Sequence, residues 1–76
     1  MEYVIVGKEF LDYVSKKTGK NVKGYTLHMT YEKEKCEGVA ANSEFVSEDI
    51  GRDVHVNDTV QLYYNKYGKV EKIVIV

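Results

Sequence analysis

Tyrosines and lysines occur together at two points of the chain, and this pairing is the strongest indication of a binding site in the sequence. The stretch QLYYNKYGK, residues 61–69, places three tyrosines within five positions beside two lysines. The stretch KNVKGYTL, residues 20–27, places Tyr25 beside two more lysines. An aromatic ring can stack on a nucleic-acid base, and an ammonium group can neutralise a phosphate. The pairing therefore predicts binding of single-stranded nucleic acid that depends on salt and ignores sequence.

Strand alternation indicates which tyrosines are free to bind. Over residues 60–65, Val60 and Leu62 fall on the side suited to a core, whereas Tyr63 projects to the other side. Tyr67 falls at a turn before Gly68, and Tyr25 follows a Lys-Gly step. The predicted stacking residues are Tyr25, Tyr63 and Tyr67. The predicted phosphate contacts are Lys16, Lys17, Lys20, Lys23, Lys66, Lys69 and Lys72.

Tyrosine is also a common strand residue, so packing is the competing explanation for each ring. Packing at the margin of the core is the preferred interpretation of Tyr31 and Tyr64. For Tyr25 and Tyr63 the sequence does not decide between packing and base stacking. The stretch VKGYTLHMTYE leaves its faces undecided, because Tyr25, Leu27, Met29 and Tyr31 make a good core stripe while base stacking needs Tyr25 to be reachable.

Candidates for catalysis and metal binding are few. His28 and His55 stand alone, without another histidine or cysteine at ligand spacing, and Cys36 lies among glutamates that disfavour a reactive thiolate. No Gly-rich loop leads from a strand into a helix, so the sequence offers no phosphate cradle of the nucleotide-enzyme kind. We expect neither an enzyme nor a bound metal or cofactor.

Charge is distributed unevenly along the chain, although the formal net charge is only −1. Residues 1–31 carry five lysines against three acids (+2), residues 32–58 eight acids against three bases (−5), and residues 59–76 three lysines against one acid (+2). If the two ends lie side by side, one face is positive despite the total. The acidic middle supports a rival function, a protein-interaction module that docks on a host protein by strand addition or through its acidic face. Its acids include Glu44, Glu48, Asp49, Asp53 and Asp58.

The hydrophobic pattern predicts an all-β protein of five strands. Residues 2–14 read as one strand in which Gly7 indicates a bulge or bend. Residues 22–33 alternate most clearly, and residues 37–47 form a weaker third strand. A helical turn is expected near 47–52, capped by Ser47. Residues 59–76 form a hairpin with its tip at NKYGK.

Five strands in 76 residues favour a small closed barrel in a single domain, 1–76. The OB type fits best and the SH3-like type is the alternative, with at most one short helical turn. The lone cysteine fits a reducing cytoplasm, and no apolar run approaches the roughly 20 residues of a membrane span. We therefore expect a cytoplasmic protein without a membrane partner.

The order of a bent first strand, a lysine-bearing turn, a GYTL strand, an acidic middle and a late hairpin tipped by aromatic-Gly resembles a known family. It is similar to the small single-stranded-DNA-binding proteins of filamentous phages and to related replication proteins of phages and mobile elements in Gram-positive bacteria. The resemblance implies an OB barrel that forms homodimers and coats single strands during replication. It also implies stacking by Tyr25 and Tyr67, the latter on DNA bound by the partner subunit, and phosphate contacts by Lys20, Lys23, Lys69 and Lys72.

Overall fold

The computed structural model describes residues 2–76 and consists mostly of antiparallel β-sheet, with five strands and one short helix. The first three strands are β1 (Glu2–Val14), β2 (Asn21–Tyr31) and β3 (Ala40–Ser47). The helix α1 (Glu48–Gly51) follows, and β4 (Thr59–Tyr64) and β5 (Val70–Ile75) form the last hairpin. The five predicted strands and the predicted helical turn near 47–52 are thus confirmed, although Ser47, at the N-cap position, makes no side-chain capping hydrogen bond.

The predicted irregularity at Gly7 is a bulge in the ladder between β1 and β2. Ile5 pairs with Met29 and Gly7 with His28, so one residue of β1 is left over between the pairs. The extra residue reverses which side chains of β1 face the core. Ile5 is fully buried before the bulge, whereas Phe10 shares a face with Tyr25 after it.

The core lies on one face of β2, which settles the orientation that the sequence left open. Leu27 and Met29 are buried, and Tyr25 and Tyr31 are half-buried on the same side. The other buried side chains come from the remaining strands and from the loop after α1: Ile5, Val46, Val54, Val60 and Val70. Helix α1 packs on this core through Ile50 and through Gly51, where a Cβ would lie 2.8 Å from Tyr25.

The strand order in the sheet is β3-β2-β1-β4-β5, which brings the N-terminal and C-terminal strands together. Glu2–Val4 of β1 pair with Thr59–Gln61 of β4. The sheet is not closed: β3 and β5 approach each other, but no ladder joins them among residues 2–76. The expectation of full closure is therefore not met. A side-chain contact, from the Tyr64 hydroxyl to Glu44 at 3.4 Å, spans β4 and β3 instead.

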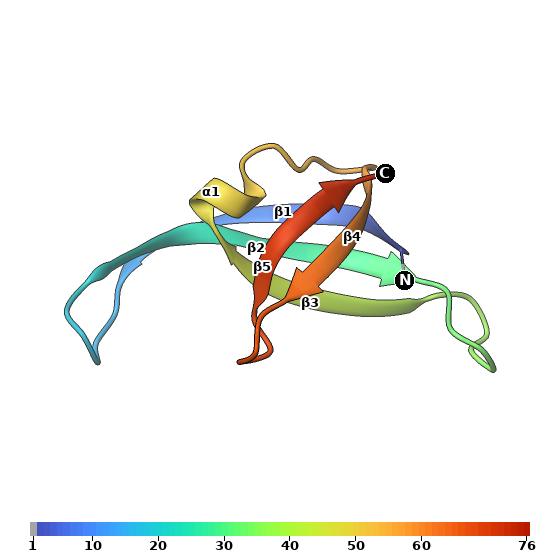
Figure 1. The fold of residues 1–76 in the computed structure, drawn as a ribbon, viewed down its shortest axis with the longest axis horizontal. Coiled ribbons are helices and arrows are strands. Elements are labelled where there is room, and N and C mark those ends of the chain that lie inside the picture. The colour runs from blue at the N-terminus through green and yellow to red at the C-terminus, as the bar shows by residue number, and fades with distance from the viewer. Residues whose placement is uncertain (1) are drawn as a thin grey trace.

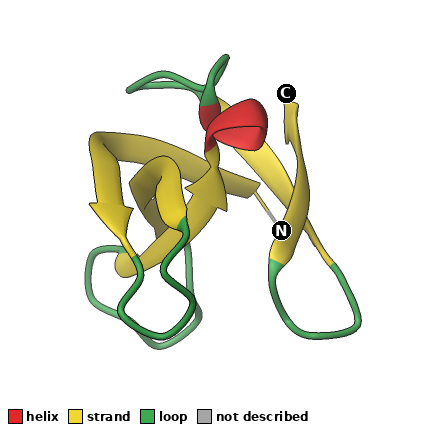
Figure 2. Cartoon of the chain, turned by 90° about the vertical axis from the view of Figure 1, so that its left-hand side faces the viewer, coloured by secondary structure: helices red, strands yellow, loops and turns green. Residues whose placement is uncertain are grey.

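The molecule is elongated because the outer halves of β1 and β2 leave the core as a long hairpin arm (Figure 1). The tip of this arm and the tip of the β4–β5 hairpin point to the same side of the molecule in both views, away from α1 (Figures 1 and 2). The β2–β3 loop, residues 32–39, extends to the same side in Figure 1, so three loops project there and two of them carry the predicted lysines.

Candidate nucleic-acid interface

The tip of the β1–β2 arm carries the first group of predicted lysines. The turn is closed by backbone hydrogen bonds from Ser15 to Lys20 and from Gly19 to Ser15, at 2.9 and 2.8 Å. Gly19 has a φ of 69°, a conformation that glycine adopts without steric cost. Lys16, Lys17, Lys20 and Lys23 are all exposed. Asp12 pairs with Lys23 in the register, so the excess positive charge lies mainly at the tip.

The tip of the β4–β5 hairpin holds Tyr67 in a defined place. The Asn65 side-chain oxygen accepts the backbone N–H groups of Tyr67 and Lys69, at 2.9 and 3.1 Å. Gly68 donates to the Asn65 carbonyl and has a φ of 78°, which closes the turn. The Tyr67 side chain is 73% exposed, and Lys66 Nζ lies 5.1 Å from its ring centroid. This tip therefore presents an aromatic ring with a cation beside it.

Tyr63 lies further down the same hairpin and is also accessible. It is 48% exposed and pairs with Lys72 across the ladder, whose Nζ lies 6.0 Å from the ring centroid. The Tyr63 hydroxyl donates to Gln61 at 3.3 Å. The predicted outward direction of Tyr63 is confirmed, and Lys69 and Lys72 are exposed beside it.

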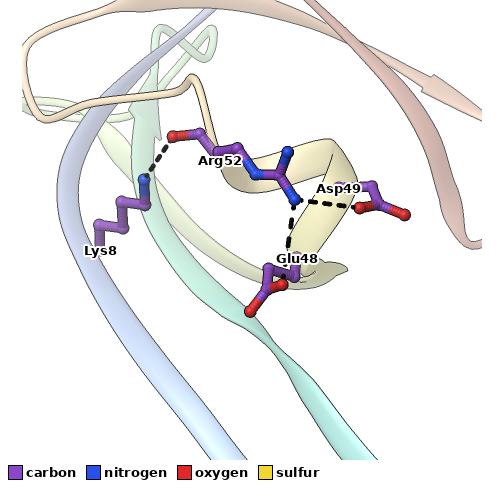
Figure 3. A network of polar contacts seen from close by, with 4 residues as sticks. All are labelled: Lys8, Glu48, Asp49 and Arg52. Carbon is purple, nitrogen blue, oxygen red and sulfur yellow. Dashed lines mark hydrogen bonds and ion pairs between the residues drawn. The ribbon is translucent and has the colours of Figure 1, made fainter.

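Tyr25 has a different environment, at the base of the arm and next to α1. Its ring packs on Gly51, lies 5.4 Å from the Phe10 ring and has Lys8 Nζ 4.3 Å from its centroid. Lys8 also donates to the Arg52 carbonyl at 3.2 Å, at the end of α1 (Figure 3). The ring is half-buried, so less of it is open to a base than of Tyr63 or Tyr67.

The structure therefore brings the predicted residues together in two groups rather than one. One group is the β4–β5 hairpin with Tyr63, Tyr67 and three lysines, and the other is the arm with Tyr25 and four lysines. Among residues 2–76, no aromatic or cation–π contact joins the two groups.

Three side chains that the sequence prediction missed belong near these groups. Lys8 and Phe10 face Tyr25 only because the bulge at Gly7 reverses the alternation of β1. Phe45, on the outer face of β3, is 44% exposed. Its ring packs over Gly24, where a Cβ would lie 2.7 Å from the Phe45 Cζ atom. Alternation with the buried Val46 could have indicated that Phe45 points outward.

Tyr31 is half-buried, in keeping with the packing interpretation, whereas Tyr64 is 43% exposed and does not belong to the core, so that interpretation is wrong for Tyr64. The Tyr31 ring lies 5.3 Å from the Tyr3 ring in an edge-on arrangement. Tyr64 donates to Glu44, and burial raises the pKa of the Tyr64 hydroxyl to about 12, with the negative charge of Glu44 adding to the effect. A phenolate at this position is strongly disfavoured, so Tyr64 acts as a hydrogen-bond donor.

The outer face of the sheet carries a row of polar side chains across three strands. His28 Nδ1 lies 2.9 Å from the Ser43 hydroxyl, and His28 Nε2 lies 3.6 Å from Glu9. The row has the residue types of a catalytic triad, but it lies on an exposed strand face. Its central strand, β2, pairs with β1 on one side and with β3 on the other, so the backbone N–H groups of β2 are not free to stabilise an oxyanion. We interpret it as cross-strand pairing that stabilises the sheet.

Two further questions about the part of the chain that the structure describes concern a metal-ligand cluster and an apolar helix. No cluster of three or more His, Cys, Asp or Glu side chains there could hold a metal ion, and Cys36 is exposed and free. No helix within residues 2–76 is both long and apolar enough to cross a membrane.

Comparisons of the chain with protein-family models, with curated proteins and with solved structures found no match. The functional argument therefore depends on the residues of this chain and their geometry.

Proposed function

We propose that the protein binds single-stranded DNA without sequence preference, through tyrosine stacking and lysine–phosphate contacts. The observation that carries the proposal is the tip of the β4–β5 hairpin, where Asn65 fixes the backbone at Tyr67 and the exposed Tyr67 ring has the Lys66 ammonium beside it. An exposed ring next to a cation has the chemistry that a base and its phosphate require, which supports contact with a single strand.

The fold proposed for this function is an OB-like barrel with an open seam between β3 and β5. The strand order supports it, because β1 lies at the centre and pairs with both β2 and β4. OB-folds bind oligonucleotides through the loops between strands 1 and 2 and between strands 4 and 5. In this chain these loops are residues 15–20 and 65–69, which carry five of the seven predicted lysines, all of them exposed.

In the proposed mechanism, successive bases stack on exposed rings while ammonium groups follow the phosphates. Tyr67 and Tyr63 supply stacking surfaces on one hairpin, and Tyr25 offers a smaller exposed part at the base of the arm. Because the chain has one arginine and no long helix, base-edge reading of a duplex is disfavoured. A homodimer would double the binding surface and raise the avidity. The resemblance to phage proteins implies a role in replication of a phage or mobile element.

The test is a titration of fluorescently labelled oligo-dT with the protein at several salt concentrations. We expect the logarithm of the affinity to fall linearly with the logarithm of the salt concentration, with a slope near −0.7 for each phosphate contacted. A mixed-sequence oligonucleotide should bind with an affinity within a few-fold of oligo-dT, whereas duplex DNA should bind more weakly. Absence of binding at low salt, or an affinity that does not change with salt, would overturn the proposal.

A further inference from the structure

A shallow groove separates α1 from β5, on the side of the molecule away from the two lysine-bearing tips (Figure 1). Ile50 of α1 and Val54 after it form one wall, and Ile73 and Ile75 of β5 form the other. Ile75 is 48% exposed, although its neighbour across the ladder, Val60, is fully buried. The groove thus continues the apolar core to the surface.

The edge of β5 that faces this groove has unused backbone groups. Val76 donates its N–H to the Thr59 carbonyl at 2.8 Å, and Val74 pairs with Gln61 further along. Hydrogen-bonding alternates along an antiparallel pair, so the N–H and C=O groups of Ile73 and Ile75 point away from β4. No strand pairs with this edge among residues 2–76.

Charge around the groove is negative. Asp49 and Asp53 flank it on the helix side and Glu71 on the strand side, while Lys72 is the one base that lines it. Arg52 lies 3.3 Å from Asp49 and 3.9 Å from Glu48, so it compensates part of the charge of α1 but leaves Asp53 and Glu71 without a salt bridge in the described chain (Figure 3). An unpaired strand edge with an apolar wall and acidic flanks suits an extended peptide that carries apolar and basic side chains.

We infer that this groove binds a basic, extended segment of a partner protein, which adds as a strand to the free edge of β5. The backbone of the segment would pair with Ile73 and Ile75, its apolar side chains would lie against Ile50, and its lysines or arginines would reach Asp53 and Glu71. Strand addition obtains affinity from main-chain hydrogen bonds and specificity from alternate side chains. The groove gives the acidic middle of the chain a function that nucleic-acid binding does not use.

The groove and the DNA-binding tips lie on different sides of the molecule and share one lining residue, Lys72, which is also a predicted phosphate contact. The acidic flanks repel phosphate, and the lysine-bearing tips extend from the other side of the molecule (Figures 1 and 2). Each site has its own probe, so either proposal can fail its test without affecting the other.

The experiment uses a labelled peptide of alternating lysine and valine, matched in length to β5, with a glutamate–valine peptide as the control probe. Binding is measured by fluorescence anisotropy and located by amide NMR shifts of the isotope-labelled protein. The Ile75→Pro variant removes one edge N–H without breaking the ladder to β4, and Ile75→Val is its matched control. The double reversal Asp53→Lys with Glu71→Lys is compared with Glu34→Lys with Glu37→Lys in the distant β2–β3 loop.

We expect the lysine–valine peptide to bind and to shift the amides of Ile73 and Ile75 in the absence of oligonucleotide. Ile75→Pro and the reversal at Asp53 and Glu71 should each weaken binding about tenfold, and the two controls should not. Equal binding of the glutamate–valine peptide, shifts elsewhere, or an unaffected Ile75→Pro variant would overturn the inference. Concentration-dependent self-association that Ile75→Pro abolishes would also overturn it, since a second copy of the chain would then occupy the edge.

Discussion

The side-chain oxygen of Asn65 accepts the backbone N–H of Tyr67 at 2.9 Å, and this bond fixes the most exposed tyrosine of the chain. The same oxygen accepts the N–H of Lys69, so one amide fixes the backbone at both residues. A turn whose backbone is ordered before the ligand arrives loses less conformational entropy on binding. The tip is thus organised for contact with a partner although it contributes little to the core.

The first prediction concerns the Tyr67 ring. Tyr67→Ala should weaken oligo-dT binding by about 1–3 kcal/mol, because one stacked base loses its platform. Tyr67→Phe should retain most of the affinity, since the π-face and not the hydroxyl makes the contact. Both variants should unfold at the wild-type denaturant concentration because the side chain is largely exposed. Anisotropy titrations and urea denaturation measure the two effects. Equal affinities of the wild type and Tyr67→Ala would exclude Tyr67 from the interface.

The second prediction tests whether the order of the turn around Tyr67 matters for binding when the Tyr67 ring itself is kept. Asn65→Ala keeps Tyr67 but removes both side-chain hydrogen bonds, so stability should fall by about 1–2 kcal/mol and DNA affinity should fall several-fold. Asn21→Ala, a matched change at the start of β2, should alter neither quantity. If Asn65→Ala binds DNA as well as the wild type, the order of the tip is irrelevant to binding.

The third prediction assigns the salt dependence to particular lysines. Replacing Lys66 and Lys69 by glutamine should reduce the slope of log affinity against log salt by about 0.7 for each phosphate that is no longer neutralised. The pair Lys33→Gln with Lys35→Gln, in the β2–β3 loop, removes the same charge and should leave the slope unchanged. Equal slopes for the two double variants would show that only the net charge of the protein matters.

Much of the fold could be predicted because it depends on local patterns. Alternation identified the five strands, and a lone glycine among β-branched residues identified the bulge, where a Cβ would lie 3.2 Å from the His28 ring, a tight contact. The exposed positions of Tyr63 and Tyr67 followed from the same alternation and from Gly68 at the turn.

The rest could not be predicted because it depends on register across strands. Lys8 meets Tyr25 because the bulge shifts β1 by one residue, and no single strand contains that information. Whether β3 and β5 pair is likewise decided by the curvature of the whole sheet. A closed barrel was expected, but no ladder joins β3 to β5 in the described residues. The contact of Phe45 with Gly24 is also a diagonal one across two strands.

The fourth prediction tests that contact. A Cβ at position 24 would meet the Val46 carbonyl oxygen and the Phe45 ring, so Gly24→Ala should cost about 2–3 kcal/mol of stability. Gly19→Ala, whose Cβ would have open space but whose φ is 69°, should cost about 1 kcal/mol. Denaturation of the two variants gives the comparison, and faster amide exchange along the β2–β3 ladder should accompany the Gly24 change alone. A smaller loss for Gly24→Ala than for Gly19→Ala would contradict the close packing of β2 against β3.

The last prediction follows from the pKa of Tyr64, which burial and then the charge of Glu44 raise from 10.0 to about 12. Between these two pH values the unfolded chain has released the phenol proton and the folded chain has kept it, so the free energy of unfolding should fall as pH rises from 10 to 12. Tyr64→Phe should remove this part of the fall, and Glu44→Gln should reduce it because one cause of the shift is gone. Glu34→Gln, in an exposed loop, is the control and should change nothing. Urea denaturation at a series of alkaline pH values measures the effect, and an identical pH dependence in the wild type and Tyr64→Phe would show that the fold does not raise the pKa of Tyr64.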